Sequence, residues 1–240
     1  MASWWNSSGG LAYHFVAWRQ KRAWREFRAQ IGEFLNSHVT PKGELLLIGP
    51  SGGYTLPSEW LGQFEQIMAL DPDPLAPLFF RRNHPGIEVH WSRRDYFIDS
   101  QRQWRSQGLD EIAADFPHHT LFFTNLIGQF PFLLKKPQLE NENEWRDWRE
   151  HWRGTLESRR WISVHDLFSS DRRPHPPLNG STLPPTKQEF IHQVYSGDSS
   201  ILVNDHLTFD LLPSPDVARR YVWPLYSGQI HLVEAAAKNC

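Results

Sequence analysis

The sequence predicts an α/β protein with a doubly wound, mostly parallel sheet of seven strands and an N-terminal helical addition. Short apolar runs such as Glu44–Ile48 and Thr120–Thr124 contain no breaker and suit strands that are buried on both faces. Longer segments with apolar residues at helical spacing alternate with these runs. Two further apolar runs flank the turn Tyr226-Ser227-Gly228 and predict a closing hairpin.

Composition is typical of a globular protein with a real core. The chain has 240 residues, of which 40% are hydrophobic, and this suits one large α/β domain with additions. The formal charge of −2 creates no overall field, so we expect no nucleic-acid partner and a small-molecule substrate. Cys240 is the only cysteine, which excludes an internal disulfide and fits a cytoplasmic location. We find no signal peptide and no apolar run of about 20 residues, so no membrane association is expected.

Two regions are expected along the chain. Residues 1–40 form the helical addition, in which 11–35 is a helix broken once. Its apolar face comprises Trp24, Phe27, Ile31 and Phe34. Residues 41–240 form a Rossmann-like domain. The Ser-, Pro- and Arg-rich stretch near 169–186 is predicted to be a lid-like loop, because long loops in compact domains usually carry function.

A glycine-rich turn follows the first strand, Glu44–Ile48. The turn reads Gly49-Pro50-Ser51-Gly52-Gly53, and glycines there permit positive φ and a close approach of the backbone to a ligand. A helix is predicted to begin at Pro57-Ser58-Glu59. Asp71 ends the second strand, 22 positions after Gly49. A glycine turn between strand and helix, with an acid about 20 residues further on, is how α/β sheets hold a nucleoside.

This arrangement resembles the class I S-adenosylmethionine-dependent methyltransferases. Their first glycine loop is commonly acid-x-Gly-x-Gly-x-Gly, and an acid at the end of the second strand binds the ribose hydroxyls. The matching positions here are Leu47, Gly49, Ser51, Gly53 and Asp71. Leucine replaces the usual acid at the first of them and serine replaces the middle glycine. The resemblance implies S-adenosylmethionine as the cofactor and methyl transfer as the reaction.

The resemblance also implies roles for residues after the third and fourth strands, which are predicted at 87–91 and 120–124. Asp95 matches the acid that contacts adenine, and Asn125 lies where the family faces the methyl group. The expected cofactor-binding residues are therefore Gly49, Ser51, Gly52, Gly53, Asp71, Asp95 and Asn125. Residues 126–128 do not match the Pro-Pro-aromatic pattern of amino-methylating enzymes, which disfavours methylation of a nucleobase. An N-terminal addition often caps the substrate side in this family, and it makes Tyr13, His14 and Trp18 pocket candidates.

The remaining elements follow from periodicity and turn signals. Further helices are predicted at 75–82, 101–116, 140–160 and 186–195. In the third of these, Trp145, Trp148, Trp152 and Leu156 form one apolar stripe that we interpret as core. Further strands are predicted at 160–164, 221–225 and 229–235, with a helical turn at 214–218 and an irregular segment at 201–212.

Two histidine–aspartate pairs are the candidate catalytic residues. His165-Asp166 is predicted to end the fifth strand, and Asp205-His206 lies in the irregular segment. Methyl transfer needs a base near the acceptor, and a histidine oriented by a carboxylate suits that role. Alternatively, the four side chains could bind zinc or iron. Neither pair has His-x-x-x-His spacing, so no metal site is predicted. A third possibility is that the pairs are unrelated hydrogen-bonding residues.

Other functions remain as alternatives. Because Leu47 departs from the pattern, the chain is alternatively a non-catalytic cofactor-binding or scaffold protein. Gly49-x-Ser51-x-Gly53 also matches a serine-hydrolase elbow, and Asp166 and His206 follow in the required order. In serine hydrolases the elbow normally follows several strands, whereas here it follows the first. The hydrolase interpretation is therefore less favoured than the methyltransferase interpretation. NAD is disfavoured, because Tyr54 occupies the third glycine position of the dinucleotide fingerprint.

Overall fold

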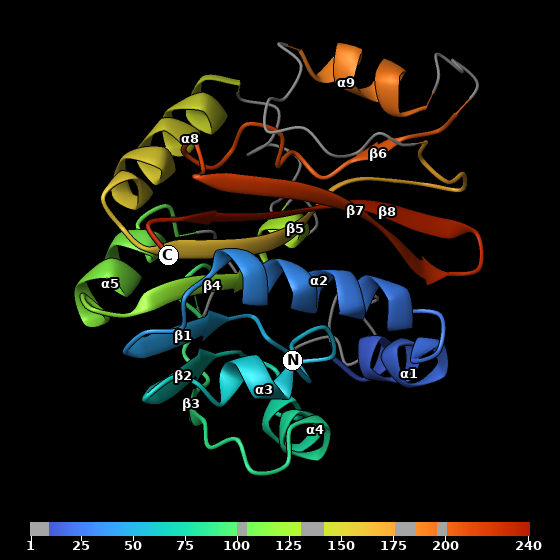
Figure 1. Cartoon of the computed structure of the whole chain (residues 1–240). Coiled ribbons are helices and arrows are strands. Elements are labelled where there is room, and N and C mark those ends of the chain that lie inside the picture. Colours follow the sequence, from blue (N-terminus) through green and yellow to red (C-terminus); the bar gives the residue numbers. More distant parts are fainter. Residues whose placement is uncertain (1–9, 100–104, 131–141, 176–185, 196–200) are drawn as a thin grey trace.

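The computed structural model describes residues 10–99, 105–130, 142–175, 186–195 and 201–240 (Figure 1). A single sheet in this part of the chain has the strand order β3-β2-β1-β4-β5-β8-β7, with the two-residue β6 paired to β5. The strands are β1 (Glu44–Ile48), β2 (Gln66–Leu70), β3 (His90–Ser92), β4 (Thr120–Thr124), β5 (Trp161–Ser170), β6 (Asn204–Asp205), β7 (Val217–Tyr226) and β8 (Gln229–Lys238). The predicted path of seven strands is therefore confirmed.

The sheet is parallel from β3 to β5 and antiparallel from β5 to β7. The chain runs outward from β1 through β2 to β3, then returns to the other side of β1 with β4 and β5. This reversal between β1 and β4 is the point where open α/β sheets bind ligands beyond the carboxyl ends of their strands. The closing antiparallel hairpin, β7 and β8, is also confirmed.

Helices cover both faces of the sheet. They are α1 (Gly10–Gln20), α2 (Arg25–His38), α3 (Ser58–Leu61), α4 (Ala76–Asn83), α5 (Gly108–Asp115), α8 (Glu142–Glu157) and α9 (Lys187–Val194), with the short 3₁₀ helix η1 (Ile127–Gln129). No helix in the described ranges is long and apolar enough to span a membrane. The predicted break in the N-terminal helix and the predicted helices near α4, α8 and α9 are confirmed.

Alternation along β1 shows why its sequence is continuously apolar. Leu45 and Leu47 join one core, which includes Phe27 of α2 and Trp60 of α3. Leu46 and Ile48 point the other way, into a second core with α5 and α8. Successive side chains of a strand point to opposite faces, so residues 45–48, which are covered on both sides, are all apolar. The tryptophan stripe of α8 belongs to the second core, as predicted.

The N-terminal helices pack on the C-terminal hairpin. Figure 1 shows α2 lying across the sheet, with α1 beside it. The Nε1–H of Trp24 donates to Pro224 O at 3.0 Å and Leu225 O at 3.1 Å. Phe27 stacks on Trp223 with ring centroids 5.1 Å apart. The first and last parts of the described chain therefore share one core.

Several predicted boundaries were wrong. The strand predicted at 87–91 is β3 at 90–92. The helix predicted to begin at Pro57-Ser58-Glu59 does begin there, as α3, and it is short because β2 already begins at Gln66. The helical turn predicted at 214–218 overlaps the start of β7, and the long ladder between β7 and β8 explains why these residues are extended. The start of the predicted lid, Ser169 and Ser170, belongs to β5, while residues 176–185 lie outside the described residues.

Candidate functional site

Polar residues collect at the edge of the sheet where the parallel strands end. The glycine turn follows β1, Asp71 follows β2 and Asn125 follows β4. Asp166 lies two residues beyond Val164, the β5 residue that pairs with the last residue of β4. The carboxyl ends of parallel strands meet at one edge, so these residues face a common region of the molecule.

The glycine turn adopts the backbone that its sequence predicts. Gly49 and Gly53 have φ values of 70° and 64°, and Ser51 also has a positive φ, of 49°. A Cβ added at Gly53 would lie 2.6 Å from Nε2 of His84, so this position has no room for a side chain. Ser51 adopts the left-handed conformation at the position where the methyltransferase pattern has glycine.

Asp71 fixes this turn with its buried carboxylate. Its Oδ2 accepts a hydrogen bond from the amide of Ser51 at 2.7 Å, and its Oδ1 accepts from the amide of Asp73 at 2.9 Å. Burial raises the pKa of Asp71 to about 6, although the two amide hydrogen bonds act in the opposite direction. An ionised carboxylate has about four acceptor positions, so each oxygen retains one for a ligand hydroxyl.

Helix α1 is joined to the neighbouring loops through His14. Nε2 of His14 donates to Asp73 Oδ2 at 3.0 Å, and Nδ1 accepts from the Tyr54 hydroxyl at 2.7 Å. The ring of Tyr54 lies over Gly52, where an added Cβ would be 2.7 Å from it. Of the three predicted pocket candidates on α1, His14 is buried, Tyr13 contacts the ring of Tyr54, and Trp18 is 68% exposed.

Leu47 and Asp95 are two further positions that match the methyltransferase pattern. Leu47 is fully buried in the core, so this position carries no acid for the cofactor. Asp95 accepts hydrogen bonds from the amides of Phe97 and Ile98 at 2.9 and 3.0 Å, and both bonds lie within its own turn. These contacts order the turn that contains Asp95, and its contact with adenine stays a prediction.

Asn125 connects the end of β4 to β5. It has a φ of 64°, a left-handed conformation in which asparagine is enriched. Its Nδ2 donates to Asp166 Oδ2, and its Oδ1 accepts from the amide of Asp166, both at 3.1 Å. Gly128 lies so close that an added Cβ would be 3.0 Å from the Asp166 amide nitrogen. These contacts fix the position and orientation of the Asp166 carboxylate.

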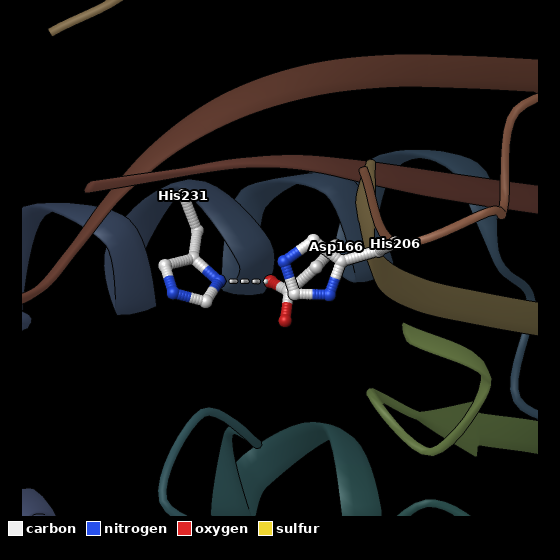
Figure 2. Close-up of side chains that lie close together, drawn as sticks. All are labelled: Asp166, His206 and His231. Carbon is white, nitrogen blue, oxygen red and sulfur yellow. Dashed lines mark ion pairs between the residues drawn. The ribbon is translucent and has the colours of Figure 1, made fainter. Parts of the chain in front are cut away.

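Asp166, His206 and His231 form a buried cluster, called the Asp–His–His cluster below (Figure 2). One potential ligand atom from each residue lies within 4.8 Å of the other two. Asp166 Oδ1 and His231 Nδ1 are 3.0 Å apart, the contact marked in Figure 2. Even so, Asp166 Oδ1 and both ring nitrogens of His231 make no hydrogen bond of acceptable direction with the described residues.

The backbone around the cluster selects one form of His206. Its Nδ1–H donates to the carbonyl oxygen of Gly128 at 2.8 Å, and Nε2 then accepts from the Ser169 hydroxyl at 3.1 Å. Thr208 donates from its hydroxyl to the backbone oxygen of Asp166 at 2.6 Å. The lone pair of His206 is therefore on Nε2.

The cluster carries an ionised carboxylate at neutral pH. Complete burial raises the pKa of Asp166, but the adjacent His231, His206 and Asn125 lower it to about 2. An enclosed carboxylate beside two imidazoles has two principal chemical uses. It orients a histidine that accepts a proton, or it binds a metal ion together with the histidines.

The structure separates each predicted histidine–aspartate pair. Strand β5 continues through both residues of the first pair, so His165 and Asp166 point to opposite faces. His165 Nδ1 lies 2.9 Å from Ser163 Oγ, and burial lowers the pKa of His165 to about 4. Asp205 accepts from Lys187 Nζ at 2.6 Å. Asp166 and His206 come together in the cluster, whereas His165 and Asp205 lie outside it.

His231 was missed by the sequence analysis. It lies in β8, which was predicted as a strand from its apolar residues, and no local motif marks it. The register places it opposite Ser169 of β5 and Trp223 of β7. The detectable signal was that His231 lies two positions before Val233, and therefore on the same inward-facing side of the strand.

A serine-hydrolase site is not assembled at the glycine turn. The Ser51 hydroxyl is buried and has no hydrogen-bond partner among the described residues. The ring nitrogens of His206 are bonded to Gly128 and Ser169. The turn therefore lacks the hydrogen bond from nucleophile to base that this chemistry requires.

No protein-family model matches the chain, and no curated protein matches it. Among solved structures, the N-methyltransferase NodS of Bradyrhizobium japonicum WM9 is 11% identical, with 89% of this chain and 86% of that chain covered and a TM-score of 0.42. Magnesium protoporphyrin IX methyltransferase (ChlM) of Synechocystis PCC 6803 is 11% identical, with 94% and 91% covered and a TM-score of 0.42. A methyltransferase of Anabaena variabilis ATCC 29413 is 10% identical, with 97% and 96% covered and a TM-score of 0.45.

The topology of the sheet itself defines the class of fold. The parallel part reverses between β1 and β4, the glycine turn follows β1, and an antiparallel hairpin closes one edge. The chain therefore has a Rossmann-like α/β fold of the class I methyltransferase type.

Proposed function

We propose that this protein transfers a methyl group from S-adenosylmethionine to a small molecule. The observation that carries the proposal is the placement of the glycine turn, Asp71 and the Asp–His–His cluster along one edge of the sheet. The first two suit a nucleoside, and the cluster suits an acceptor that must lose a proton. S-adenosylmethionine supplies the methyl group and the leaving group when bound, so the protein chiefly positions the acceptor.

The residues at the turn fit a nucleoside without phosphates. Gly49 and Gly53 adopt left-handed conformations that shape the turn, and Asp71 retains acceptor positions for the two ribose hydroxyls. Residues 49–56 contain no Lys or Arg that would bind a pyrophosphate. Asn125 links this region to the Asp166 carboxylate. These features favour S-adenosylmethionine over a dinucleotide.

Binding of S-adenosylhomocysteine tests the cofactor part of this proposal. That ligand is named for the NodS structure, and S-adenosylmethionine is named for ChlM. We expect the purified protein to bind it in calorimetry, and Asp71→Ala to weaken binding by about 1–3 kcal/mol because a buried acceptor is lost. Asp216→Ala is the matched control, because Asp216 is exposed and accepts a hydrogen bond from the amide of Asn239 at 2.6 Å, near the opposite, amino-terminal end of β5. Equal binding by wild type and Asp71→Ala would contradict the assignment.

A non-catalytic binding protein is the second candidate, and two observations favour it. Leu47 leaves the position of the usual acid apolar, and each oxygen of Asp71 already accepts one amide hydrogen bond. Turnover separates the two candidates. A panel of small hydroxyl, thiol and amine acceptors, with release of S-adenosylhomocysteine as the readout, supports the enzyme if any member is methylated. Tight binding without turnover on the panel supports the alternative.

A further inference from the structure

We propose that the Asp–His–His cluster binds one divalent first-row transition-metal ion. The cluster offers one carboxylate and two imidazoles from three separate parts of the chain. Zinc and iron(II) are bound by this combination of ligands, whereas magnesium and calcium prefer sites made only of oxygen atoms. Binding of the metal alone does not depend on the proposed methyl transfer.

Unsatisfied polar atoms provide the first evidence. Asp166 Oδ1 and both nitrogens of His231 are buried, Asp166 Oδ1 and His231 Nδ1 have only each other as an ion pair, and His231 Nε2 has no hydrogen-bond partner among the described residues. Leaving such atoms without a partner is costly, and each case in a native protein calls for an explanation. A metal ion between the side chains would satisfy Asp166 Oδ1 and one nitrogen of His231.

The distance between these atoms provides the second line of evidence. Asp166 Oδ1 and His231 Nδ1 are 3.0 Å apart without the direction of a hydrogen bond. Two ligands that each bind one tetrahedral zinc ion at about 2.0–2.2 Å lie about 3.3–3.6 Å from each other, so these two atoms need to separate by only about half an ångström. The potential ligand atom of His206 is within 4.8 Å of both, so a small movement of this side chain completes the set.

The surrounding hydrogen bonds provide the third line of evidence. A histidine that binds a metal usually donates its other N–H to a carboxylate, carbonyl or water. His206 donates Nδ1–H to the Gly128 carbonyl oxygen, and its Nε2 lone pair, which accepts from the Ser169 hydroxyl, would bind the ion in place of that hydroxyl. Asn125 holds the second oxygen of Asp166. Three protein ligands leave a coordination position open, as in catalytic zinc sites. If the proposed methyl transfer is correct, this position suits an oxygen or sulfur atom of the acceptor.

Titration with zinc tests the proposal. Protein freed of metal with a chelator is titrated with Zn²⁺ in calorimetry, with Mg²⁺ as the comparison ion. We expect one Zn²⁺ per chain and no comparable binding of Mg²⁺. His231→Ala and Asp166→Asn should each weaken Zn²⁺ binding by more than the roughly 10- to 100-fold that loss of an outer partner costs. Thermal unfolding of each variant establishes that it is folded.

A surface histidine supplies the matched control, because the chain has 12 histidines and zinc binds weakly to many surfaces. His151 is exposed and lies 2.6 Å from Asp110, so it is a histidine–aspartate pair outside the cluster. His151→Ala should bind Zn²⁺ as tightly as wild type. Absence of one-to-one binding in wild type, or undiminished binding by both folded cluster variants, would overturn the proposal.

X-ray absorption on the zinc-loaded wild-type protein gives a test that does not depend on variants. We expect two imidazoles and one carboxylate among the ligands of the ion. A first shell with one imidazole or none would place the zinc elsewhere and contradict the proposal.

Discussion

Asp71 and Asp166 are both buried carboxylates, yet their surroundings shift their pKa values in opposite directions. Burial dominates at Asp71 and raises its pKa to about 6. At Asp166, burial acts in the same direction, but His231, His206 and Asn125 outweigh it and lower the pKa to about 2. Asp166 is therefore ionised at every physiological pH. Asp71 changes its charge near the lower limit of the physiological pH range.

This difference predicts how pH affects cofactor binding. Ribose hydroxyls donate to an ionised Asp71, so affinity for S-adenosylhomocysteine should fall as pH falls through about 6, by at most about tenfold per pH unit. Calorimetry between about pH 5 and about pH 8 measures this dependence. Asp71→Asn, which does not ionise, should remove it. A dependence of the same size in that variant would assign the titration to another group.

The raised pKa of Asp71 also makes the stability of the ligand-free protein depend on pH, and in the opposite direction to ligand binding. A carboxyl whose pKa is higher in the folded state stabilises the fold most below its unfolded pKa of about 4. This contribution of Asp71 is lost as pH rises through about 6. Ligand binding and folding therefore favour different protonation states of one residue.

At the scale of elements, the sequence predicted best where local signals agree. The strand β1, the glycine turn and Asp71 were predicted correctly, because a breaker-free apolar run, glycines and an acid all lie within one short stretch. The end of β5 was predicted too early, at residues 164–166. Its extension to Ser170 depends on pairing with β8, in which the partner of Ser170 is Ile230.

The candidate site was only partly predictable for the same reason. Adjacent residues in a sequence suggest a pair, but strand β5 directs His165 and Asp166 to opposite faces. His231 reaches Asp166 only because the antiparallel register of β8 brings it there. Register is set by long-range pairing, which a single sequence does not reveal.

The glycine turn allows a matched test of backbone strain and side-chain crowding. Gly43 and Gly53 have nearly equal φ values of 65° and 64°, but a Cβ at Gly43 meets nothing within 4 Å, while one at Gly53 meets His84 and Phe80. Gly43→Ala should lower the free energy of unfolding by about 1–2 kcal/mol, from the left-handed conformation alone. Gly53→Ala should lower it by about 2–5 kcal/mol, because overpacking is added. Urea denaturation measures both, and equal losses would show that the buried side chains accommodate the methyl group.

At the scale of the whole molecule, the first described helices and the last strands stabilise each other. Trp24 donates to two carbonyl oxygens of β7 that lie 200 and 201 positions away in the sequence. Phe27 adds a stacked contact with Trp223, the neighbour of His231 in the register. The N-terminal helices therefore support the hairpin that provides one side of the Asp–His–His cluster.

Trp24→Phe tests this long-range connection. The variant keeps a ring in the core but loses the N–H that both carbonyl oxygens accept. Trp60→Phe is the control, since Trp60 is fully buried and its Nε1 has no hydrogen-bond partner among the described residues. Trp24→Phe should lower the free energy of unfolding by about 1 kcal/mol more than the control does. Equal values in urea denaturation would show that the two hydrogen bonds add nothing net.

The central place of β5 in the sheet has a consequence during protein synthesis. β5 pairs with β4 on one side and with β8 on the other, and β8 leaves the ribosome after both. Until then, the edge of β5 that will pair with β8 is unpaired in the nascent chain. An unpaired strand edge can form hydrogen bonds with other chains and so promotes aggregation. The same delay applies to His231, so the Asp–His–His cluster cannot be completed before β8 has been made.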